Sequence, residues 1–384
     1  MLWSACGRAS ARRLISYAVL GAVVASAGVS PVAANARVRL RPVTLDTSRF
    51  PRQVEVPGGT IGSFHIHGGW SSMDSNGDQN PYGIAVAQVT VSGVSAGTVF
   101  VCNFNNSSSL NNIQSLGTTI EEINPYASSP RAVTYIRDER ITGCNALAIN
   151  SGNRLFTASY ASNLVYGLRQ PIDWSNSEIS PSTGWTGPWG IAYDQIGSTN
   201  YLYVGGGYDG GLWRYSLSSS GATYTEICTN FYTNHGVPGT LLGPSGFSYD
   251  TVHDILYMVE GYSNSLIRIV HPWKIPAGGL IRTPYGFGGT YASYATVLSQ
   301  GGYINAPIST TVLPYDGHVL VENTGDNYVM EFGSDGSYYG RYLLDTSGTP
   351  GALFGITTYG TTLSNTRIYY NDDNTNALYY LSQS

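Results

Sequence analysis

Two short stretches near the start of the sequence carry side chains whose types and spacing suit metal binding. His65 and His67 alternate along an expected strand, which places two imidazoles on one face at a spacing that transition metals use. Asp74, Asn76 and Asp78 place oxygen atoms at alternate positions, as calcium loops do, but this segment lacks the glycine and the final acid of such a loop. We interpret it as a polar turn, with calcium as the alternative, and predict no other cofactor.

A third stretch, Gly93–Gly97, has the spacing GxSxG with Ser95 at its centre. In hydrolases this pattern exposes a nucleophilic serine on a tight turn between a strand and a helix. Here Thr98 and the residues after it are typical of a strand, so we expect a glycine-flanked turn without a catalytic role. The three glycines that begin at Gly205 also lie between strands, which excludes a phosphate-binding loop.

The elements that position these groups are repeated hairpins. LYVGGGYDGGLWRY, which begins at Leu202, consists of an apolar strand, a glycine-rich turn and a returning strand. Related hairpins begin at Leu155, Leu256, Val319 and Ile368, and VFVCNFNN at Val99 is a sixth copy with an insertion before its second strand. The chain is therefore expected to be a repeat protein.

Each hairpin is preceded by a second recurring phrase, best seen in PYGIAV, PWGIAY and PSGFSY. The six copies begin at Pro81, Cys144, Pro188, Pro244, Pro307 and Leu353. Proline suits the first residue of a strand, and we expect the glycine to allow a tight turn into the apolar run. Units of roughly 50 residues with several strands each are typical of β-propellers. We therefore predict an all-β, six-bladed β-propeller that forms one domain over residues 37–384.

The last unit ends soon after its hairpin and lacks a fourth strand, whereas residues 37–80 contain strand-like alternation without the repeat phrase. An N-terminal strand would complete the last blade and close the ring, which removes exposed strand edges. We expect the stretch Thr60–Ile66 to be this strand.

The N-terminal region has the features of an export signal. Three arginines precede an apolar run from Leu14 to Val32, and the Ala34–Ala36 triplet provides a small-x-small cleavage site. We predict a signal peptide over residues 1–36, with a membrane anchor as the alternative, and a protein that is periplasmic, extracellular or at the cell surface. No later segment is long and apolar enough to span a membrane. The formal charge is −5 and no basic cluster occurs, so neither nucleic acid nor an anionic membrane is an expected partner.

Export would allow disulfides to form. In the repeat register, Cys102 ends the second strand of the first unit and Cys144 begins the first strand of the second unit. We regard Cys102–Cys144 as a candidate disulfide, the alternative being that these cysteines are small buried apolar residues.

The two phrases together resemble NHL repeats, in which a P-x-G-I-A-V strand precedes L-Y-V-A-D-x-x-N-N-R-I. The resemblance covers about Pro81 to Leu381 and implies a six-bladed propeller with an open channel. Where the family has Asp after L-Y-V-A, this chain has Asn103, Ser159, Gly206, Glu260, Asn323 and Asp372. The family's turn asparagine recurs at Asn163, Asn264, Asn327 and Asn376, where asparagine tolerates the left-handed conformation.

In propellers of this kind the second residue of each P-x-G phrase points at the channel mouth. These six residues, called the ring below, are Tyr82, Asn145, Trp189, Ser245, Ile308 and Phe354. An aromatic wall with a few polar groups suits an organic or sugar-like ligand, and a plug of the channel is the alternative. Asn103, Glu260, Asn323 and Asp372 at the hairpin tips are further candidates for this site.

Gluconolactonase-like hydrolases share this architecture and bind a divalent cation through one Glu and through Asn or Asp at P-x-G positions. Only Asn145 matches that pattern here, although Glu260 and Glu322 lie near hairpin tips. We therefore favour a binding role over an enzymatic one and predict an exported module that binds a protein or a small ligand at its channel mouth. A metal-dependent hydrolase or lyase and a structural cell-surface protein are the alternatives.

Overall fold

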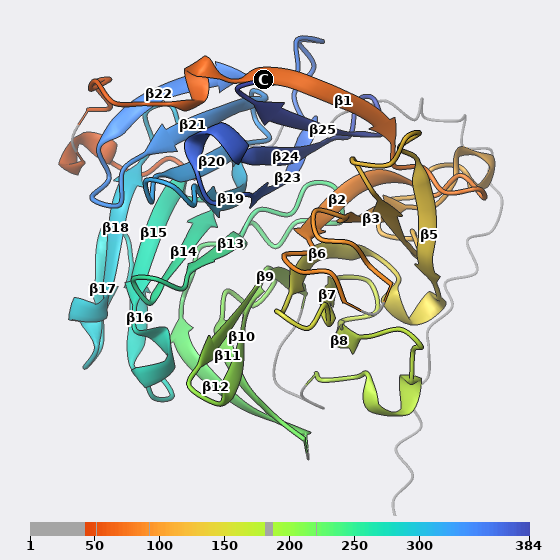
Figure 1. Cartoon of the computed structure of the whole chain (residues 1–384). Coiled ribbons are helices and arrows are strands. Elements are labelled where there is room, and N and C mark those ends of the chain that lie inside the picture. Colours follow the sequence, from red (N-terminus) through yellow and green to blue (C-terminus); the bar gives the residue numbers. More distant parts are fainter. Residues whose placement is uncertain (1–42, 51, 92, 181–186, 220) are drawn as a thin grey trace, which may run out of the picture. The chain divides into compact units, whose positions relative to one another are not determined.

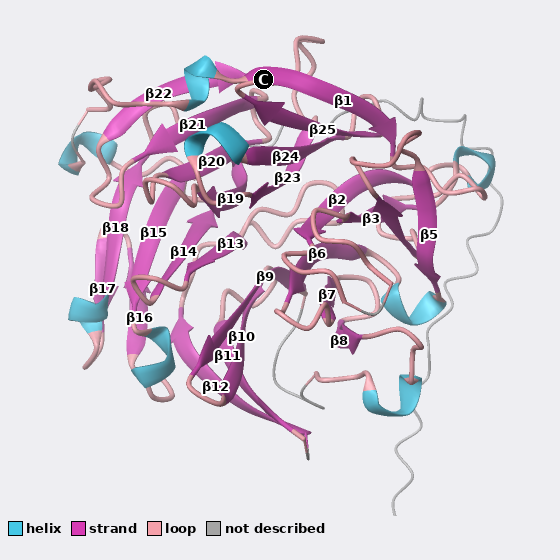
Figure 2. Ribbon diagram, viewed as in Figure 1, coloured by secondary structure: helices cyan, strands magenta, loops and turns pink. Residues whose placement is uncertain are grey.

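The computed structural model describes residues 43–50, 52–91, 93–180, 187–219 and 221–384, so the expected signal peptide lies outside the described residues. Six β-sheets are arranged around a central axis as the blades of a β-propeller (Figure 1), which confirms the predicted fold. The helical elements are single turns that lie before the first strand or between strands (Figure 2). Among the described residues, no helix has the length and apolar character needed to cross a membrane.

The blades are numbered 1 to 6 in chain order. Their innermost strands are β2 (Gln79–Val86), β6 (Cys144–Ile149), β9 (Pro188–Ile196), β13 (Pro244–Asp250), β19 (Pro307–Val312) and β23 (Leu353–Tyr359). The second strands are β3 (Val99–Asn105), β7 (Leu155–Ser159), β10 (Thr199–Gly206), β14 (Ile255–Glu260), β20 (Val319–Asn323) and β24 (Arg367–Asp372). All six P-x-G phrases thus form innermost strands, as expected.

The third strands complete the predicted hairpins, and most blades have a fourth. The third strands are β4 (Thr119–Ile123), β8 (Leu164–Leu168), β11 (Leu212–Ser218), β15 (Ser265–Val270), β21 (Tyr328–Phe332) and β25 (Ala377–Ser382). The fourth strands are β5 (Ala132–Arg137), β12 (Gly221–Thr229), β18 (Ala295–Gln300), β22 (Tyr338–Leu343) and β1 (His65–Ser71). The 3-10 turns are Thr47–Arg49, Ile61–Ser63, Ser108–Leu110, Glu139–Ile141, Trp174–Asn176, Pro272–Lys274, Ala292–Tyr294 and Leu363–Asn365.

Blades 2 and 3 depart from the four-stranded plan. In blade 2 a short segment replaces the fourth strand, with Ile179 N donating to Val165 O at 2.9 Å. Blade 3 is widened to six strands by β16 (Leu280–Thr283), which pairs with β12 in parallel, and β17 (Gly286–Gly288). These two strands belong to an insertion between β15 and β18 that the repeat pattern does not predict.

The glycine of the P-x-G phrase is needed for close packing between blades. A Cβ atom on Gly83 would lie 2.8 Å from the Ala146 backbone of the next blade, and one on Gly355 would collide with the Tyr82 carbonyl. Gly246 alone of these three has a positive φ, +48°. The glycine therefore serves mainly to let neighbouring innermost strands approach, and not the tight turn that the sequence predicts, because a side chain there would push the blades apart.

An N-terminal strand closes the ring, as predicted, but it begins later than expected. β1 pairs antiparallel with β25, from His65 opposite Ser382 to Ser71 opposite Ala377 (Figure 1). Of the predicted stretch Thr60–Ile66, only the last two residues belong to β1. The preceding Ile61–Ser63 turn is held instead by the Glu331 carboxylate, which accepts from Thr60 N and Ile61 N at 3.0 to 3.1 Å.

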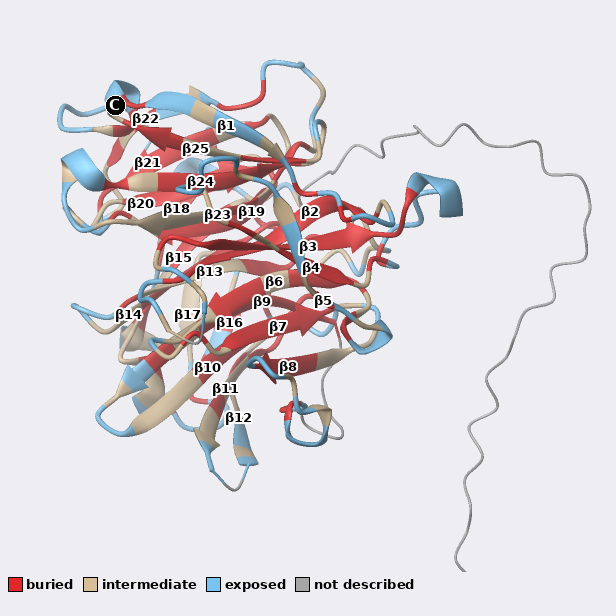
Figure 3. Ribbon diagram, turned by 45° about the vertical axis from the view of Figure 1, so that its right-hand side comes forward, coloured by how far each residue is buried: buried red, intermediate tan, exposed pale blue. Residues whose placement is uncertain are grey.

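Apolar side chains fill the spaces between neighbouring blades. In blade 1 the innermost strand β2 and the second strand β3 are wholly buried, whereas β1 at the rim is largely exposed (Figure 3). Each innermost strand lies against that of the next blade, and β23 lies against β2. Burial of this apolar surface is the main source of stability, at about 25 cal/mol per Å².

Candidate functional site

The structure brings all six ring residues together around one channel on the propeller axis. The channel is lined by three consecutive residues from each innermost strand, beginning in every blade with a ring residue. Its volume is about 50 Å³. Ligand pockets for drug-sized molecules measure roughly 300 to 1,000 Å³, so the channel as it stands has room for a few water molecules but not for a drug-sized ligand.

Aromatic packing explains why the channel is narrow. Tyr82 stacks between Phe104 and Phe354, with ring centroids 4.2 and 3.8 Å away, and the Trp189 ring meets it edge-on at 6.5 Å. Tyr82 is 2% exposed and Trp189 is 4% exposed. Ile308 belongs to the same cluster. The apolar members of the ring therefore fill the axis with one another, and a ligand stacked inside the ring would have to separate Tyr82 from Phe354.

The polar members of the ring face this small space. Asn145 donates from Nδ2 to the Trp189 carbonyl at 2.6 Å, which links blades 2 and 3. Its Oδ1 atom and the Ser245 hydroxyl are buried and have no partner among the described groups. Buried polar atoms of this kind are commonly satisfied by internal water, for which the channel has room.

Two loops from opposite blades cover the channel mouth. We call them the roof loops: residues 106–118 of blade 1, and residues 230–243, which lead into blade 4. Gln114 of the first loop lies against Gly239 of the second, and Leu241 packs into the ring cluster. The second loop is fastened by Asn234, whose side chain accepts from Gly236 N and Leu242 N at 3.0 and 2.8 Å. Sequence reasoning missed this cover because the two loops are far apart in the chain.

The hairpin-tip candidates do not line the channel. Asn103 and Asn323 instead hold the loops that lead into the innermost strands. Asn103 donates to the Ser72 carbonyl at 2.9 Å, and Asn323 accepts from Asn305 N at 3.1 Å. Asp372 accepts from Thr375 N at 3.2 Å within its own turn, and burial raises its pKa. These contacts give the three residues a structural role at the mouth.

Glu260, the fourth of these candidates, forms a fully buried ion pair with Arg282. The Arg282 Nη2 atom lies 2.8 Å from Glu260 Oε2, and both side chains are inaccessible to solvent. Glu260 also accepts from Ser263 Oγ and from Tyr232 N. Burial raises the pKa of Glu260, and Arg282 opposes that shift. Because Arg282 lies on β16, the pair ties the inserted strands of blade 3 to blade 4.

The turn asparagines do more than adopt the left-handed conformation. Each accepts, through its Oδ1 atom, a hydrogen bond from a backbone N–H at the start of the innermost strand of the next blade, either directly before the strand or, for Asn80, at its second residue. The pairs are Asn163 with Gly187, Asn264 with Ala306, Asn327 with Ala352 and Asn376 with Asn80, at 2.7 to 3.1 Å. Four of the six blade junctions are therefore latched at the mouth by one repeated asparagine.

The Asp74–Asp78 segment, for which calcium binding was the alternative, is a turn whose carboxylates already have partners. Asp74 accepts from Asn76 N and Asp78 N at 2.9 and 2.8 Å and pairs with Arg137. Asp78 accepts from Thr118 N at 2.8 Å. The geometry therefore agrees with the polar turn that we preferred.

The two histidines of β1 lie on one face of the strand at the rim of blade 6. The His67 ring stacks on Tyr380 at 5.0 Å, and His65 is exposed. No third ligand accompanies them among the described residues, where the one group of three His, Cys, Asp or Glu with ligand atoms within 4.8 Å is Asp316, His318 and Glu331.

This last group, which sequence reasoning missed, clamps the N-terminal segment. His318 Nδ1 lies 2.7 Å from Glu331 Oε1, and both oxygens of Glu331 accept from the backbone before β1. The carboxylate and imidazole groups of this cluster therefore already contact one another and backbone N–H groups. The cluster acts as an anchor for the closing strand.

A disulfide joins Cys102 to Cys144, the pair chosen from the repeat register, and so connects blades 1 and 2. The third cysteine of the described residues, Cys228, is a buried thiol whose pKa is raised by burial.

Comparison with known proteins shows the fold and leaves the family open. No family model matches the sequence, and no curated protein matches it. The NHL-repeat resemblance therefore stays a prediction.

Solved structures with the same fold have different functions. Virginiamycin B lyase from Staphylococcus aureus is 16% identical, with a TM-score of 0.51 over 83% of this chain and 99% of that chain. A gluconolactonase from Xanthomonas campestris is 12% identical, with a TM-score of 0.53 over 89% and 96%. A chain of a nidogen–laminin complex is 15% identical, with a TM-score of 0.51 over 74% and 87%. At these identities the likeness shows a six-bladed β-propeller and nothing about activity.

The residues of the channel do not fit the divalent cation of gluconolactonase-like enzymes. Of the ring, Tyr82, Asn145 and Ser245 carry oxygen atoms, and no carboxylate is among the described residues that line the channel. Hard cations prefer several oxygen ligands, usually with carboxylates among them. Among the described residues, the channel lining therefore offers no carboxylate for a hard cation.

Proposed function

We propose that this protein is an exported binding module that docks another protein on its mouth face through the two roof loops. The observation that carries the proposal is the exposure of apolar side chains on these loops. Leu110, Ile113 and Leu116 of the first loop are 58%, 46% and 41% exposed, and Val237 of the second loop is 68% exposed. The contact between Gln114 and Gly239 brings the two loops into one surface.

The energetics favour a protein partner over a small ligand. Covering each of these half-exposed side chains contributes on the order of 1 kcal/mol, and exposed apolar groups gathered on one surface commonly mark interaction sites. The channel beneath offers about 50 Å³, which is too small for an organic ligand. Exposed apolar side chains over a packed channel suit the side chains of another protein.

The first roof loop is built to present its side chains rigidly. Ile113 N donates to Asn106 Oδ1 at 2.6 Å, and Asn105 donates to Asn112 Oδ1 at 2.9 Å. These hydrogen bonds use the Ile113 backbone and asparagine side chains. The apolar side chain of Ile113 is therefore left free to contact a partner. A preorganised loop loses little entropy on binding.

Export of the module is supported by two features. The sequence begins with arginines and an apolar run typical of a signal peptide. Disulfides such as Cys102–Cys144 persist mainly outside the cytosol.

The test compares partner recovery by charge variants on opposite faces of the propeller. Ile113→Asp places a carboxylate in the proposed interface. Val252→Asp is the matched control, since Val252 is 83% exposed in the turn between β13 and β14, at the other end of the blade. Affinity-tagged wild type and V252D, recovered from the producing organism, are expected to retain the same partner protein, which I113D loses. Equal recovery by all three would refute docking on the mouth face.

A further inference from the structure

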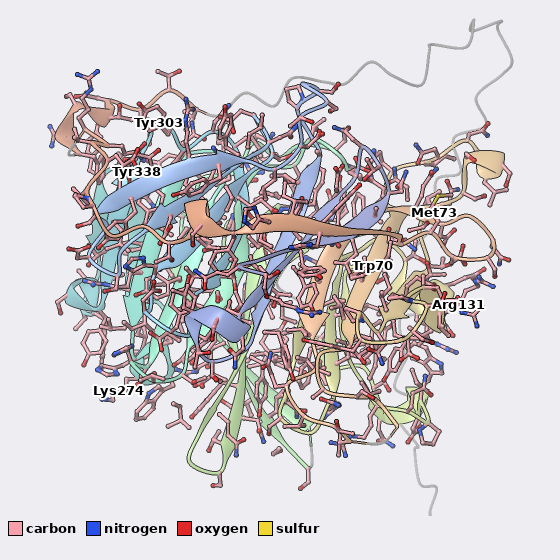
Figure 4. The ribbon with its side chains drawn as sticks, turned by 45° about the horizontal axis from the view of Figure 1, so that its top comes forward. Trp70, Met73, Arg131, Lys274, Tyr303 and Tyr338 are labelled. Atoms are coloured by element: carbon pink, nitrogen blue, oxygen red, sulfur yellow. A yellow bond between two sulfur atoms is a disulfide. The ribbon has the colours of Figure 1, made fainter. Side chains whose placement is uncertain are left out.

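A second cavity lies at the far end of blade 1, between the turn that joins β2 to β3 and the loop that joins β4 to β5. Its volume is about 210 Å³, four times that of the axial channel. We propose that this cavity binds a free α-amino acid, with Arg131 holding its carboxylate and Glu122 its ammonium group. Arg131 lies at the periphery of the propeller (Figure 4), so the site is separate from the mouth face.

The two charged groups of the cavity lack partners. Glu122 is half-buried on β4, opposite Phe100 and Val133 in the sheet, and makes no hydrogen bond or ion pair with any residue that the structure describes. Burial raises its pKa above the ordinary value. Arg131 is exposed and is likewise without a described ion-pair partner. A partly buried carboxylate without a donor is costly, and a cation placed against it would relieve that cost.

One acid and one base that line the same cavity without pairing favour a ligand that carries both opposite charges. A guanidinium can hold a carboxylate through two parallel hydrogen bonds, and a carboxylate can accept from an ammonium group. The volume lies below the roughly 300 to 1,000 Å³ of drug-sized pockets, which suits a molecule the size of one amino acid.

The rest of the lining is consistent with recognition of a small polar molecule. Ser95 and Thr98 supply hydroxyl groups from the turn, and Asn124 supplies an amide whose oxygen already accepts from Tyr126 N at 2.9 Å. Val94 and Val133 form an apolar part of the cavity wall. Ser95 is the centre of the GxSxG string, but no histidine lines the cavity, so the site binds its ligand without a base to activate the serine.

Calorimetric titration with L-valine, L-glutamine and L-phenylalanine tests the proposal. Each amino acid is compared with its N-acetyl form, which lacks the ammonium group, and with its amide, which lacks the carboxylate. We expect at least one amino acid to bind, and both of its derivatives to bind about tenfold more weakly or worse, equivalent to about 1.4 kcal/mol. Absence of binding at millimolar concentration, or equal binding of the derivatives, would overturn the assignment.

Two variants assign the charges to the two residues. Arg131→Gln should weaken binding of the free amino acid and remove its advantage over the amide. Glu122→Gln should remove the advantage of the free amino acid over the N-acetyl form. Arg52→Gln and Glu55→Gln make the same charge changes at exposed positions outside the cavity and should bind as the wild type does. An unchanged thermal midpoint shows that each variant is folded. Full retention of both preferences in R131Q and E122Q would contradict the site.

Discussion

Replacement of Glu121 by Gln should change the stability of the fold in a pH-dependent way. Glu121 lies on β4 and is 1% exposed. Its Oε2 atom accepts from Thr134 Oγ1 at 3.2 Å, and its Oε1 atom has no partner among the described groups. Burial raises the pKa of Glu121 from 4.5 to about 7, and the nearby Asp74 and Asp78 add to the shift, which Thr134 and Arg137 oppose.

The sign and size of the effect follow from this pKa. A raised pKa means that the folded protein binds the proton more tightly than the unfolded chain does. The contribution of protonated Glu121 to the free energy of unfolding is therefore complete below the unfolded pKa of 4.5, and it is lost as the pH rises through about 7. Each pKa unit corresponds to about 1.4 kcal/mol, so ionisation of Glu121 lowers the free energy of unfolding by about 3 kcal/mol at alkaline pH.

Urea unfolding followed by tryptophan fluorescence measures the effect. Glu121→Gln removes the ionisation, so the variant should match the wild type at about pH 4 and exceed its stability by about 3 kcal/mol at about pH 8. Asp194 and Glu322 also have pKa values raised by burial, so the difference between variants isolates Glu121 better than the wild-type curve does. Glu139→Gln, at an exposed position, is the control. A difference that is the same at both pH values would refute the reasoning.

Three further substitutions test the contacts between blades, each by urea unfolding. Asn376→Ala removes the latch to blade 1 and places alanine at a φ of 52°, so it should cost about 2 kcal/mol, whereas Asn376→Gly should cost less because glycine tolerates this φ. Arg282→Ala strands the Glu260 carboxylate and should cost about 3 to 5 kcal/mol, of which Glu260→Gln in the same chain should restore part. Replacing Cys102 and Cys144 together with Ser should cost about 4 kcal/mol, from the loop entropy of a 42-residue separation.

Each of these expectations can fail in its own way. An N376A variant as stable as the wild type would mean that the latch contributes nothing. An R282A variant that gains no stability from E260Q would show that the stranded carboxylate is not the source of the loss. Equal stability of the oxidised wild type and the serine variant would show that the disulfide does not constrain the unfolded chain.

The sequence predicted the blades because their determinants are local. Proline at the first position of the innermost strand, alternating apolar residues and the turn asparagines such as Asn264 all act within a few residues. Cys102 and Cys144 could be paired because the register of two adjacent repeats places them close together. The start of the closing strand was predicted too early, because the acceptor that holds residues Thr60 and Ile61 is Glu331, which the local pattern does not reveal.

The candidate site was only partly predictable for the same reason. The second residue of each P-x-G phrase was placed on the axis, but whether Tyr82 and Phe354 leave a space or close it depends on how their rings stack. The cover formed by the roof loops depends on the contact of Gln114 with Gly239. The two loops share no sequence pattern that would predict this contact. Contacts of this kind are set by tertiary packing and are not encoded in the spacing of residues within a repeat.

Photo-crosslinking from single positions tests the central claim most directly. A photoreactive phenylalanine analogue at Leu110 on the mouth face, and the same group at Val252 on the opposite face, would be activated in the producing organism. The account predicts a discrete adduct with another protein from position 110 and none from position 252. Adducts from position 252 alone, or equal adducts from both, would contradict the proposal that the roof loops are the binding surface.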